Sequence, residues 1–449
     1  MSGAAGGRGR PWEGRRIHLV GVGGAGMSAY ARAAVALGAE VSGSDGAGGA
    51  YLERLRADGI LDVRPGHRAQ NVPAGADVEL FYSSAIPAEN EERAAARERG
   101  IAEHPRADLL AELTALRRTV AVAGTHGKTT TASMLVHALR AAGMEPGWLI
   151  GGSVGGGLAN AEWGEGEWLV VEADESDRSM LSLVVEIAVV TNVELDHHAT
   201  YGSLAELREA FREFLSGPRC AVVWARPELL ELRDGPVVAY DAPEPALLDG
   251  GSRLEWRGQT VTLAVPGAHN ALNAVAALEA ARLAGVGEAE AIAGLAAFRG
   301  AGRRFQELGR SARGARVFDD YAHHPTEVAA TLAGARTLEH RRLIAVFQPH
   351  LYSRTASLAA AFGRALAVAD VVVVLDVYPA RELAVDHPGV SGLMIAEAAA
   401  REAGGRPVYW LASFDDARPV LLDLLEEGDV CVVMGAGDVD SLTRELVAR

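Results

Sequence analysis

The chain has 449 residues, of which 49% are hydrophobic, and a formal net charge of -16 at pH 7. That length exceeds what one hydrophobic core usually supports and predicts two to four domains. The negative charge disfavours a nucleic-acid partner, and the sequence contains no uncharged apolar run of about 18 residues that would predict a membrane span. Two distant cysteines and the lack of an apolar signal core give the expectation of a cytoplasmic protein.

The cationic residues are almost all arginine. Of 43 Lys and Arg residues, only Lys128 is a lysine, which is the pattern that a GC-rich coding bias would leave. Arginine is a planar fork, whereas lysine delivers a compact point charge on a thin stem. We therefore expect Lys128 to stand where arginine cannot serve.

The first hundred residues alternate between apolar strands and helical segments. Strands are expected at residues 16–20 and 39–42, separated by a glycine-rich turn and an alanine-rich helix over residues 28–37. The alternation continues to about Pro105 and predicts a Rossmann-like domain over residues 1–105.

The turn in this first domain has the spacing G-x-G-x-x-G, formed by Gly21, Gly23 and Gly26. After a strand this spacing is a weak dinucleotide fingerprint, and Asp45 ends the second strand roughly where an NAD enzyme keeps its ribose-binding acid. The turn alone therefore leaves NAD binding open.

A second domain begins with an expected strand at residues 119–123, a loop from Gly124 to Thr130 and a helix over residues 130–142. Such a loop cradles phosphates with backbone N–H groups, and its lysine, Lys128, reaches the β- and γ-phosphates. Thr129 is placed to ligate Mg²⁺. The strict P-loop pattern is not met, because Val122 occupies the position of its first glycine.

Two later strands supply what such a loop lacks. The expected strand at residues 168–172 ends in the carboxylates of EADESD, and the one at residues 187–191 is followed by TNVELDHH. A carboxylate at a strand end beside a P-loop is the usual second anchor for Mg²⁺. A simple dehydrogenase has no use for this arrangement, so the sequence favours an ATP-using enzyme.

The last third returns to strand–helix alternation. Helices are expected over residues 269–297 and a hinge at 298–302, followed by strands near 316–319, 343–347, 371–375 and 430–434. The predicted fold is α/β with three domains in series. They are a Rossmann-like domain (1–105), a P-loop ATPase-like domain with a mostly parallel sheet (106–300) and a second Rossmann-like domain (301–449).

Twelve short motifs in one order resemble the Mur ligase family from about residue 15 to the C-terminus. They are GVGGAGMS (21–28), SGSD (42–45), SSAI (83–86), GTHGKTTT (124–131), EADESD (172–177), TNVELDHH (191–198), HNALN (269–273), GRRFQ (302–306), DDYAHHPTE (319–327), FQPH (347–350), DVYPA (376–380) and GAGD (435–438). The resemblance implies one domain each for a UDP-sugar, ATP and an amino acid.

The resemblance also implies an activity and its substrates. The carboxylate of UDP-N-acetylmuramate would attack ATP with Mg²⁺ present, and the resulting acyl phosphate would react with an amino acid to form an amide. L-alanine is the expected amino acid, with glycine, serine or a preformed peptide as alternatives. The alternative to an enzyme is a related protein that binds these ligands without catalysing the ligation. The protein is expected to be a monomer or a homodimer.

The resemblance carries over to the following residues of this sequence. Catalytic roles fall on Lys128, Glu172 and His197, and Mg²⁺ ligation falls on Thr129, Glu172 and His197. ATP contacts fall on Gly124, Thr125, His126, Gly127, Lys128, Thr129, Thr130, Asn270, Asn273, Arg303, Arg304 and Asp320. UDP-sugar contacts fall on Gly23, Gly24, Gly26, Met27, Ser28, Ser44, Asp45, His67, Ser83 and Ser84. Amino-acid contacts fall on Tyr321, His323, His350, Arg354 and Arg381.

The third domain departs from the family pattern at two positions that bear on the amino acid. Leu351 stands where the family usually has an arginine after QPH, and Arg381 stands where it usually has a glycine. One hypothesis is that Arg381 replaces the missing cation; the alternative is drift at tolerant surface positions.

Overall fold

The computed structural model describes residues 10–46, 48–60, 62–196 and 200–447. They group into two compact units. The described residues of the first unit lie within Met1–Asp241 and Asn273–Leu295, and those of the second lie within Ala242–Leu272 and Ala296–Arg449. In the described part of the chain, every helix is too short or too polar to cross a membrane.

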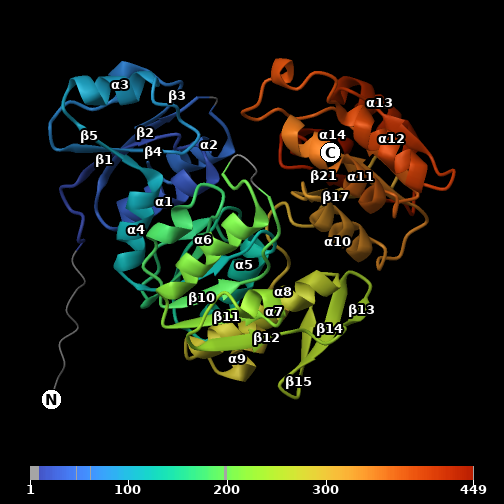
Figure 1. Cartoon of the computed structure of the whole chain (residues 1–449), viewed down its shortest axis with the longest axis horizontal. Coiled ribbons are helices and arrows are strands. Elements are labelled where there is room, and N and C mark those ends of the chain that lie inside the picture. Colours follow the sequence, from blue (N-terminus) through green and yellow to red (C-terminus); the bar gives the residue numbers. More distant parts are fainter. Residues whose placement is uncertain (1–9, 47, 61, 197–199, 448–449) are drawn as a thin grey trace. The chain divides into compact units, whose positions relative to one another are not determined.

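The first unit opens with a five-stranded parallel sheet in the order β3-β2-β1-β4-β5 (Figure 1). Its strands are β1 (Arg16–Val20), β2 (Glu40–Asp45), β3 (Val63–Pro65), β4 (Val78–Tyr82) and β5 (Ala102–Pro105). The helices of this part are α1 (Ala25–Ala36), α2 (Ala50–Ala57), α3 (Glu91–Glu98) and α4 (Arg106–Ala115), with a 3-10 turn at Ala69–Asn71. The strand order reverses between β1 and β4. In an open parallel sheet, this reversal makes a ligand crevice at the carboxyl ends of the strands.

The same unit continues into a seven-stranded sheet in the order β12-β11-β10-β6-β9-β7-β8, in which only β7 and β8 pair antiparallel. The strands are β6 (Arg118–Ala123), β7 (Gly147–Leu149), β8 (Ala161–Glu162), β9 (Trp168–Ala173), β10 (Ile187–Val190), β11 (Cys220–Trp224) and β12 (Val237–Tyr240). The helices are α5 (Lys128–Ala141), α6 (Leu204–Ser216) and α7 (Pro227–Leu230), with a 3-10 turn at Ser179–Ser182. Most of α8 (Ala268–Leu283) and α9 (Glu288–Ala297) also belongs to this unit, while residues 268–272 and 296–297 belong to the second. Here too the order reverses at β6, so the loop after β6 lies at a switch point.

The second unit contains a six-stranded sheet in the order β16-β17-β21-β18-β19-β20, parallel except at β16. Its strands are β16 (Gln306–Arg310), β17 (Arg316–Asp320), β18 (Leu343–Phe347), β19 (Val371–Val374), β20 (Val408–Trp410) and β21 (Val430–Met434). Its helices are α10 (Pro325–Ala335), α11 (Tyr352–Leu366), α12 (Gly392–Glu402), α13 (Phe414–Leu424) and α14 (Asp440–Leu446). Strands β18, β19 and β21 are buried along their whole length, as expected when apolar clusters cover both faces of a parallel sheet.

A small antiparallel sheet in the second unit was not predicted. It joins β13 (Ala246–Leu248), β14 (Gly251–Trp256) and β15 (Gln259–Leu263) in chain order. The expected strands and helices elsewhere are confirmed within a few residues. One shift matters: α5 begins at Lys128, two residues earlier than expected, so the lysine opens the helix.

Candidate functional site

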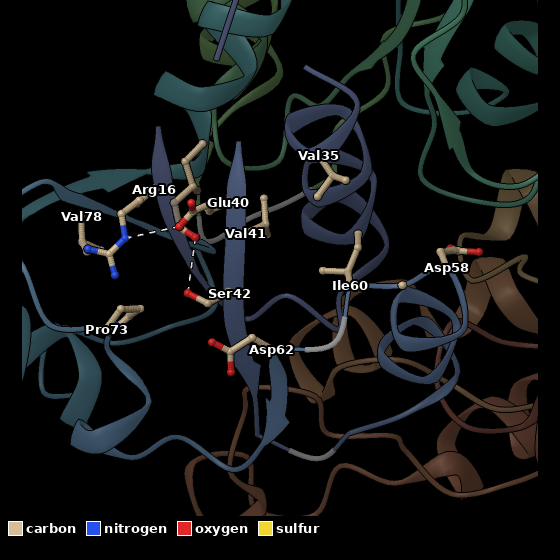
Figure 2. A pocket seen from close by; sticks show the side chains of 12 residues that line it. Arg16, Val35, Glu40, Val41, Ser42, Asp58, Ile60, Asp62, Pro73 and Val78 are labelled. Carbon is tan, nitrogen blue, oxygen red and sulfur yellow. Dashed lines mark hydrogen bonds and ion pairs between the residues drawn. The ribbon is translucent and has the colours of Figure 1, made fainter. Parts of the chain in front are cut away.

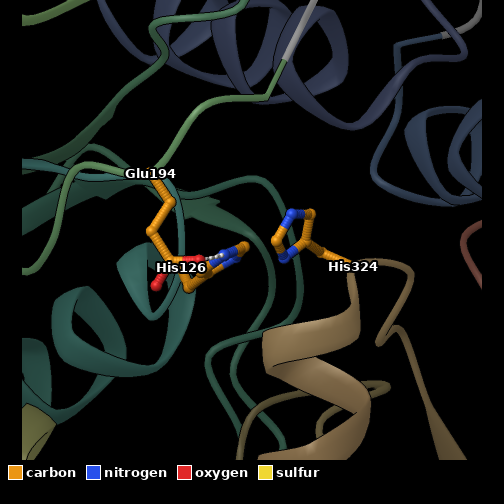
Figure 3. A group of neighbouring side chains, drawn as sticks. All are labelled: His126, Glu194 and His324. Carbon is orange, nitrogen blue, oxygen red and sulfur yellow. Dashed lines mark ion pairs between the residues drawn. The ribbon is translucent and has the colours of Figure 1, made fainter. Parts of the chain in front are cut away.

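The loop after β6 is held in one conformation by the segment that follows β10. Thr191 Oγ1 and Asn192 Nδ2 donate to the carbonyl of His126 at 2.6 and 2.9 Å, and the His126 N–H donates to Asn192 Oδ1 at 2.9 Å. Glu194 Oε2 lies 3.5 Å from His126 Nε2. Figure 3 draws this ion pair as a dashed line. The backbone N–H groups at the start of α5 are therefore presented on a fixed turn, which suits a phosphate.

The glycines of this loop are required by space and by backbone geometry. Gly124 and Gly127 have φ of +137° and +82°. A Cβ on Gly127 would lie 2.6 Å from Asn273 Oδ1, and one on Gly124 would overlap Thr191 Oγ1. Side chains at either position would strain the turn and push away its supports.

Lys128 points its amine back over the loop. Nζ donates to the carbonyls of Gly124 and Thr125 at 2.6 and 3.3 Å, and to both carboxylate oxygens of Glu175 at 3.1 and 2.9 Å. Burial, the largest effect, lowers the pKa of Lys128, but the charges of Glu175 and Asp174 outweigh it and raise the pKa above its ordinary value. The amine is thus a charged, desolvated donor at the mouth of the phosphate loop.

The candidate Mg²⁺ ligands come from adjacent strand ends. Strand β9 pairs with β6 so that Val122 lies opposite Glu172, and Glu172 Oε1 accepts the N–H of Gly151 at 3.1 Å. Thr129 is in the first turn of α5 and is 7% exposed. A hydroxyl and a carboxylate are oxygen donors of the kind that Mg²⁺ takes, so these residues fit the ion. The third candidate, His197, lies outside the described residues.

The two asparagines at the start of α8 have different surroundings. Asn270 Nδ2 donates to the carbonyl of Pro266 at 2.7 Å, while Asn273 packs against Gly127 of the phosphate loop. Both are 7% exposed. The structure therefore brings Asn273 to the loop and commits the amide of Asn270 to the backbone.

The turn after β1 is built around Asp45. The N–H of Gly23 donates to Asp45 Oδ2 at 3.0 Å, and a Cβ on Gly23 would lie 2.7 Å from Asp45 Cγ. Gly24 is the residue before α1, and a Cβ on Gly21 would lie 2.9 Å from Ser83 Cβ. The glycines, Asp45 and Ser83 are thus brought together at the switch point; Ser84 is exposed beside them.

Met27 and Ser28 face inward instead. They are 2% and 1% exposed, and Asn160 Nδ2 donates to Ser28 Oγ at 3.2 Å and to Ala25 O at 2.9 Å. The side chains of these two predicted contact residues are therefore not available to a ligand, and the N–H of Ser28 is bonded to the carbonyl of Gly24.

A buried cluster lies under the end of β2. Ser44 Oγ is 2.8 Å from both Glu92 Oε2 and His67 Nδ1, and Glu92 also contacts His18, Asn71 and the N–H of Arg68. The His67 side chain is 20% exposed, whereas Glu92 is fully buried. Ser44 and His67, both predicted, therefore share a partner that was not predicted.

Arg106, at the start of α4, connects the first turn to the loop after β9. Its Nε and Nη2 donate to Asp177 at 2.7 Å and Asp174 at 2.9 Å, and Nη1 lies 3.2 Å from the Cβ position of Gly26. Burial is the largest effect and raises the pKa of Asp174, but Arg106 and Lys128 outweigh it and hold that pKa below its ordinary value. Asp174 is therefore ionised beside the phosphate loop.

In the second unit, aromatic and basic side chains gather at the carboxyl ends of β17 and β18. The His323 ring lies 5.3 Å from Tyr321 and 5.9 Å from His350, and Arg354 Nη1 lies 3.1 Å from His350 Nδ1. Arg354 is 4% exposed, whereas Arg381 is exposed, and none of the contacts described in this cluster involves it.

The start of the second unit's sheet gathers the remaining predicted ATP residues. The guanidinium carbons of Arg303 and Arg304 both lie 5.1 Å from the Tyr321 ring, and Arg303 Nε donates to Asp319 at 3.1 Å. Burial raises the pKa of Asp320 to about 6, against the opposing effects of Arg304 and two backbone N–H donors. His324, drawn in Figure 3, caps α10 in this unit.

Three family models match successive parts of the chain. They are the Mur ligase family, catalytic domain (residues 16–118), the Mur ligase middle domain (122–281) and the Mur ligase, glutamate ligase domain (303–437). The chain belongs to the Mur ligase family. The predicted α/β fold with three domains in series is thereby confirmed.

Curated relatives match this Mur ligase over nearly its whole length. Two examples, both named UDP-N-acetylmuramate–L-alanine ligase, come from Mycolicibacterium smegmatis and Rubrobacter xylanophilus. The protein from Mycolicibacterium smegmatis is 42% identical over 98% of this chain and 96% of its own length, and the one from Rubrobacter xylanophilus is 43% identical over 97% and 100%.

Two solved structures are also similar to this chain over nearly its whole length. The crystal structure of UDP-N-acetylmuramate-alanine ligase from Thermotoga maritima has a TM-score of 0.82 and 29% identity, covering 96% of this chain and 98% of that one. A murein peptide ligase from Psychrobacter arcticus has a TM-score of 0.71 and 25% identity over 96% and 98%.

Sequence reasoning missed three residues that organise the sites of this Mur ligase. Glu175 holds Lys128, Arg106 joins two loops, and Glu92 supports Ser44 and His67. Glu175 stands in the EADESD motif, so the sequence offered a signal for it, whereas Arg106 lies in none of the twelve motifs. Glu92 stands in EERAAARE, which looks like a solvated helix.

Proposed function

We propose that this protein joins L-alanine to UDP-N-acetylmuramate with the energy of ATP, a step of peptidoglycan precursor synthesis. The proposal is carried by one observation: relatives at 42–43% identity over nearly the full chain are named for this reaction. The phosphate loop with its desolvated lysine supports the use of ATP.

The reaction has two steps. The substrate carboxylate attacks the γ-phosphorus of ATP, and the bond to the β-phosphate oxygen breaks to give an acyl phosphate and ADP. The amine of L-alanine then attacks the acyl carbon, and the tetrahedral intermediate expels phosphate, loses the amine proton and leaves an amide.

The first step brings two anions together, so it needs positive charge in a water-poor site. Lys128 supplies a fixed cation, and the start of α5 supplies backbone N–H donors. Thr129 and Glu172 would hold Mg²⁺, with His197 as a third ligand. The ion would neutralise charge on the transferred phosphoryl group.

We assign the substrates to three domains with the boundaries 1–105, 106–300 and 301–449. The UDP-sugar takes the crevice beside Asp45, Ser44, His67 and Ser83, and ATP takes the phosphate loop. The amino acid takes the cluster of Tyr321, His323, His350 and Arg354, with Arg381 as a further cation.

The test is release of ADP by the purified protein with defined substrates. ADP should form only when ATP, Mg²⁺, UDP-N-acetylmuramate and L-alanine are all present, and the product should carry one alanine by mass. Glycine, serine and the tripeptide L-alanyl-γ-D-glutamyl-meso-diaminopimelate serve as competing acceptors. Faster turnover with the tripeptide would replace this proposal by a peptide ligase, and no ADP with any acceptor would end both.

A further inference from the structure

Glu92, the second residue of α3, is a carboxylate with no exposed surface. Its Oε1 accepts the N–H of Arg68 at 3.0 Å and Asn71 Nδ2 at 2.7 Å. Its Oε2 lies 2.8 Å from both Ser44 Oγ and His18 Nε2. Each oxygen therefore has two partners, which uses the acceptor sites of an ionised carboxylate.

The charge state of Glu92 follows from these contacts. Burial is the largest effect and raises the pKa of Glu92, but the hydrogen bonds from His18, Asn71, Arg68 and Ser44 outweigh it and lower the pKa from 4.5. At neutral pH the group is an anion, and an anionic carboxylate only accepts hydrogen bonds.

This fixes the direction of the next hydrogen bond. Ser44 has a single hydroxyl hydrogen and must donate it to Glu92. The contact of 2.8 Å between Ser44 Oγ and His67 Nδ1 then needs its hydrogen from the ring. A neutral His67 therefore carries its hydrogen on Nδ1 and leaves Nε2 as an acceptor.

The free acceptor faces the edge where the proposed substrate binds. His67 Nε2 lies 3.4 Å from the Cβ position of Gly46, which directly follows β2, and the His67 side chain is 20% exposed. This is the same strand end that carries Asp45 and the turn after β1.

We propose that Glu92 is a positioning residue of the UDP-sugar site: through Ser44 it fixes His67 as the Nδ1–H tautomer, so that Nε2 accepts a hydrogen bond from an O–H or N–H of the UDP-sugar. The inference rests on the proposed function for the identity of the ligand. The tautomer itself follows from the contacts within the protein.

The isosteric substitution Glu92→Gln should reverse the direction of the hydrogen bonds that join Glu92, Ser44 and His67. In Glu92→Gln the amide oxygen must stay with the obligate donors Arg68 N and Asn71 Nδ2, so the NH₂ group faces Ser44 and His18. Ser44 then accepts from the amide and donates to His67 Nδ1. The hydrogen of His67 moves to Nε2, and a donor replaces the acceptor that faced the ligand.

His18 provides an internal reporter of the same reversal. Its Nε2 donates to Glu92, and its Nδ1 lies 2.8 Å from Ser42 Oγ. Ser42 lines a cavity of about 430 Å³ near the amino ends of β1 and β2, away from the proposed UDP-sugar site. Figure 2 shows the side chains that line this cavity. His18 is fully buried and cannot contact the UDP-sugar. Its ring should change from Nε2–H to Nδ1–H in Glu92→Gln.

The experiment is ¹⁵N NMR of histidine-labelled protein at about pH 8.5, above the ordinary titration range of imidazole. The variants His67→Gln and His18→Gln assign the two rings. Wild type should show protonated Nδ1 in His67, and Glu92→Gln should show protonated Nε2. In the same variant KM for UDP-N-acetylmuramate should rise about tenfold or more, because two donors then face each other, while kcat and KM for ATP stay within about twofold.

The matched control is Glu103→Gln in the same domain. Glu103 pairs with Arg93 and Arg97, and none of its described hydrogen bonds involves Glu92, Ser44, His67 or His18. It should leave both tautomers and KM for the UDP-sugar unchanged, and a tenfold rise of KM in this control would overturn the assignment to Glu92.

Each remaining outcome decides the proposal. Protonated Nε2 of His67 in wild type would overturn it, and this measurement does not need the variant to fold. A tautomer change without a change of KM would overturn the contact with the UDP-sugar. Wild type that shows the expected tautomers but releases no ADP would refute the proposed function and leave the role of Glu92 in fixing His67 intact.

Discussion

Lys128 is surrounded by oxygen acceptors that suit an ammonium group. Two loop carbonyls and the Glu175 carboxylate approach one nitrogen between 2.6 and 3.3 Å. A planar guanidinium spreads its donors over a wider fork and cannot meet all of these acceptors from the same helix position. This geometry gives a chemical reason for the single lysine that coding bias alone does not.

Lys128→Arg should therefore lower kcat of ADP release by at least about a hundredfold, in the range seen when one preorganised donor is lost. The reverse change at an exposed site, Arg401→Lys on α12, serves as a control and should leave kcat unchanged. If Lys128→Arg kept its activity within about threefold of wild type, coding bias rather than chemistry would explain why the chain has a single lysine.

The proposed amino-acid site has lost the arginine that the family usually has at position 351, and Arg381 is the candidate to replace its positive charge. Leu351 is 8% exposed with φ of +70°, an unusual backbone for leucine, and its N–H donates to Tyr378 O at 3.0 Å. If Arg381 binds the amino-acid carboxylate, Arg381→Ala should raise KM for L-alanine about tenfold with kcat preserved. An unchanged KM, measured beside Arg354→Ala, would leave drift as the explanation.

At the scale of elements, the loop before α5 depends on glycine for two separate reasons. Gly124 has φ of +137° and no room for a Cβ beside Thr191, whereas Gly49 has φ of +124° with nothing within 4 Å. Gly124→Ala should cost about 3 kcal/mol or more of unfolding free energy and raise KM for ATP; Gly49→Ala should cost about 1 kcal/mol. Equal losses in urea unfolding would show that the contact with Thr191 contributes nothing.

The sequence predicted the buried parallel strands best. Strands β18 and β21 match the expected residues at both ends, because each is a continuous apolar run between polar loops. Strand β13 was missed because it has only three residues. Strands β14 and β15 alternate between buried and exposed residues, which is a strand signal that the prediction overlooked. Glu92 was missed because only tertiary packing distinguishes a buried acid from a solvated one in a charged helix.

His269, in the first turn of α8, should make the unfolding free energy depend on pH. Burial lowers the pKa of His269 from 6.5 to about 4, so the folded protein keeps this ring neutral where the unfolded chain protonates it. The stability that depends on the neutral ring is present above about pH 6.5 and is lost as pH falls toward 4. The loss is about 1–3 kcal/mol, since His269 is only half-buried and solvent screens part of the effect.

Urea unfolding between pH 7.5 and pH 4 measures this effect. The wild-type unfolding free energy should fall more steeply with acid than that of His269→Asn, which has no titrating ring. Parallel curves for the two proteins would contradict a buried neutral His269.

At the scale of the whole molecule, the three domains predicted from motifs form two compact units, and the first contains both the N-terminal sheet and the phosphate loop. Arg106 supports that union. It belongs to the helix that follows the N-terminal sheet, and it binds Asp174 and Asp177 from the loop after β9. Motif order cannot predict such a contact, because it depends on how two sheets pack.

Arg106→Met should destabilise the first unit by about 2–3 kcal/mol, because it leaves carboxylates of the phosphate-loop region without their cation. The value lies below that of a fully buried pair, since the Asp174 side chain is 37% exposed. The triple variant that adds Asp174→Asn and Asp177→Asn removes the unpaired charge and should recover much of the loss. If the single and triple variants unfold at the same urea concentration as wild type, Arg106 does not hold the two sheets together.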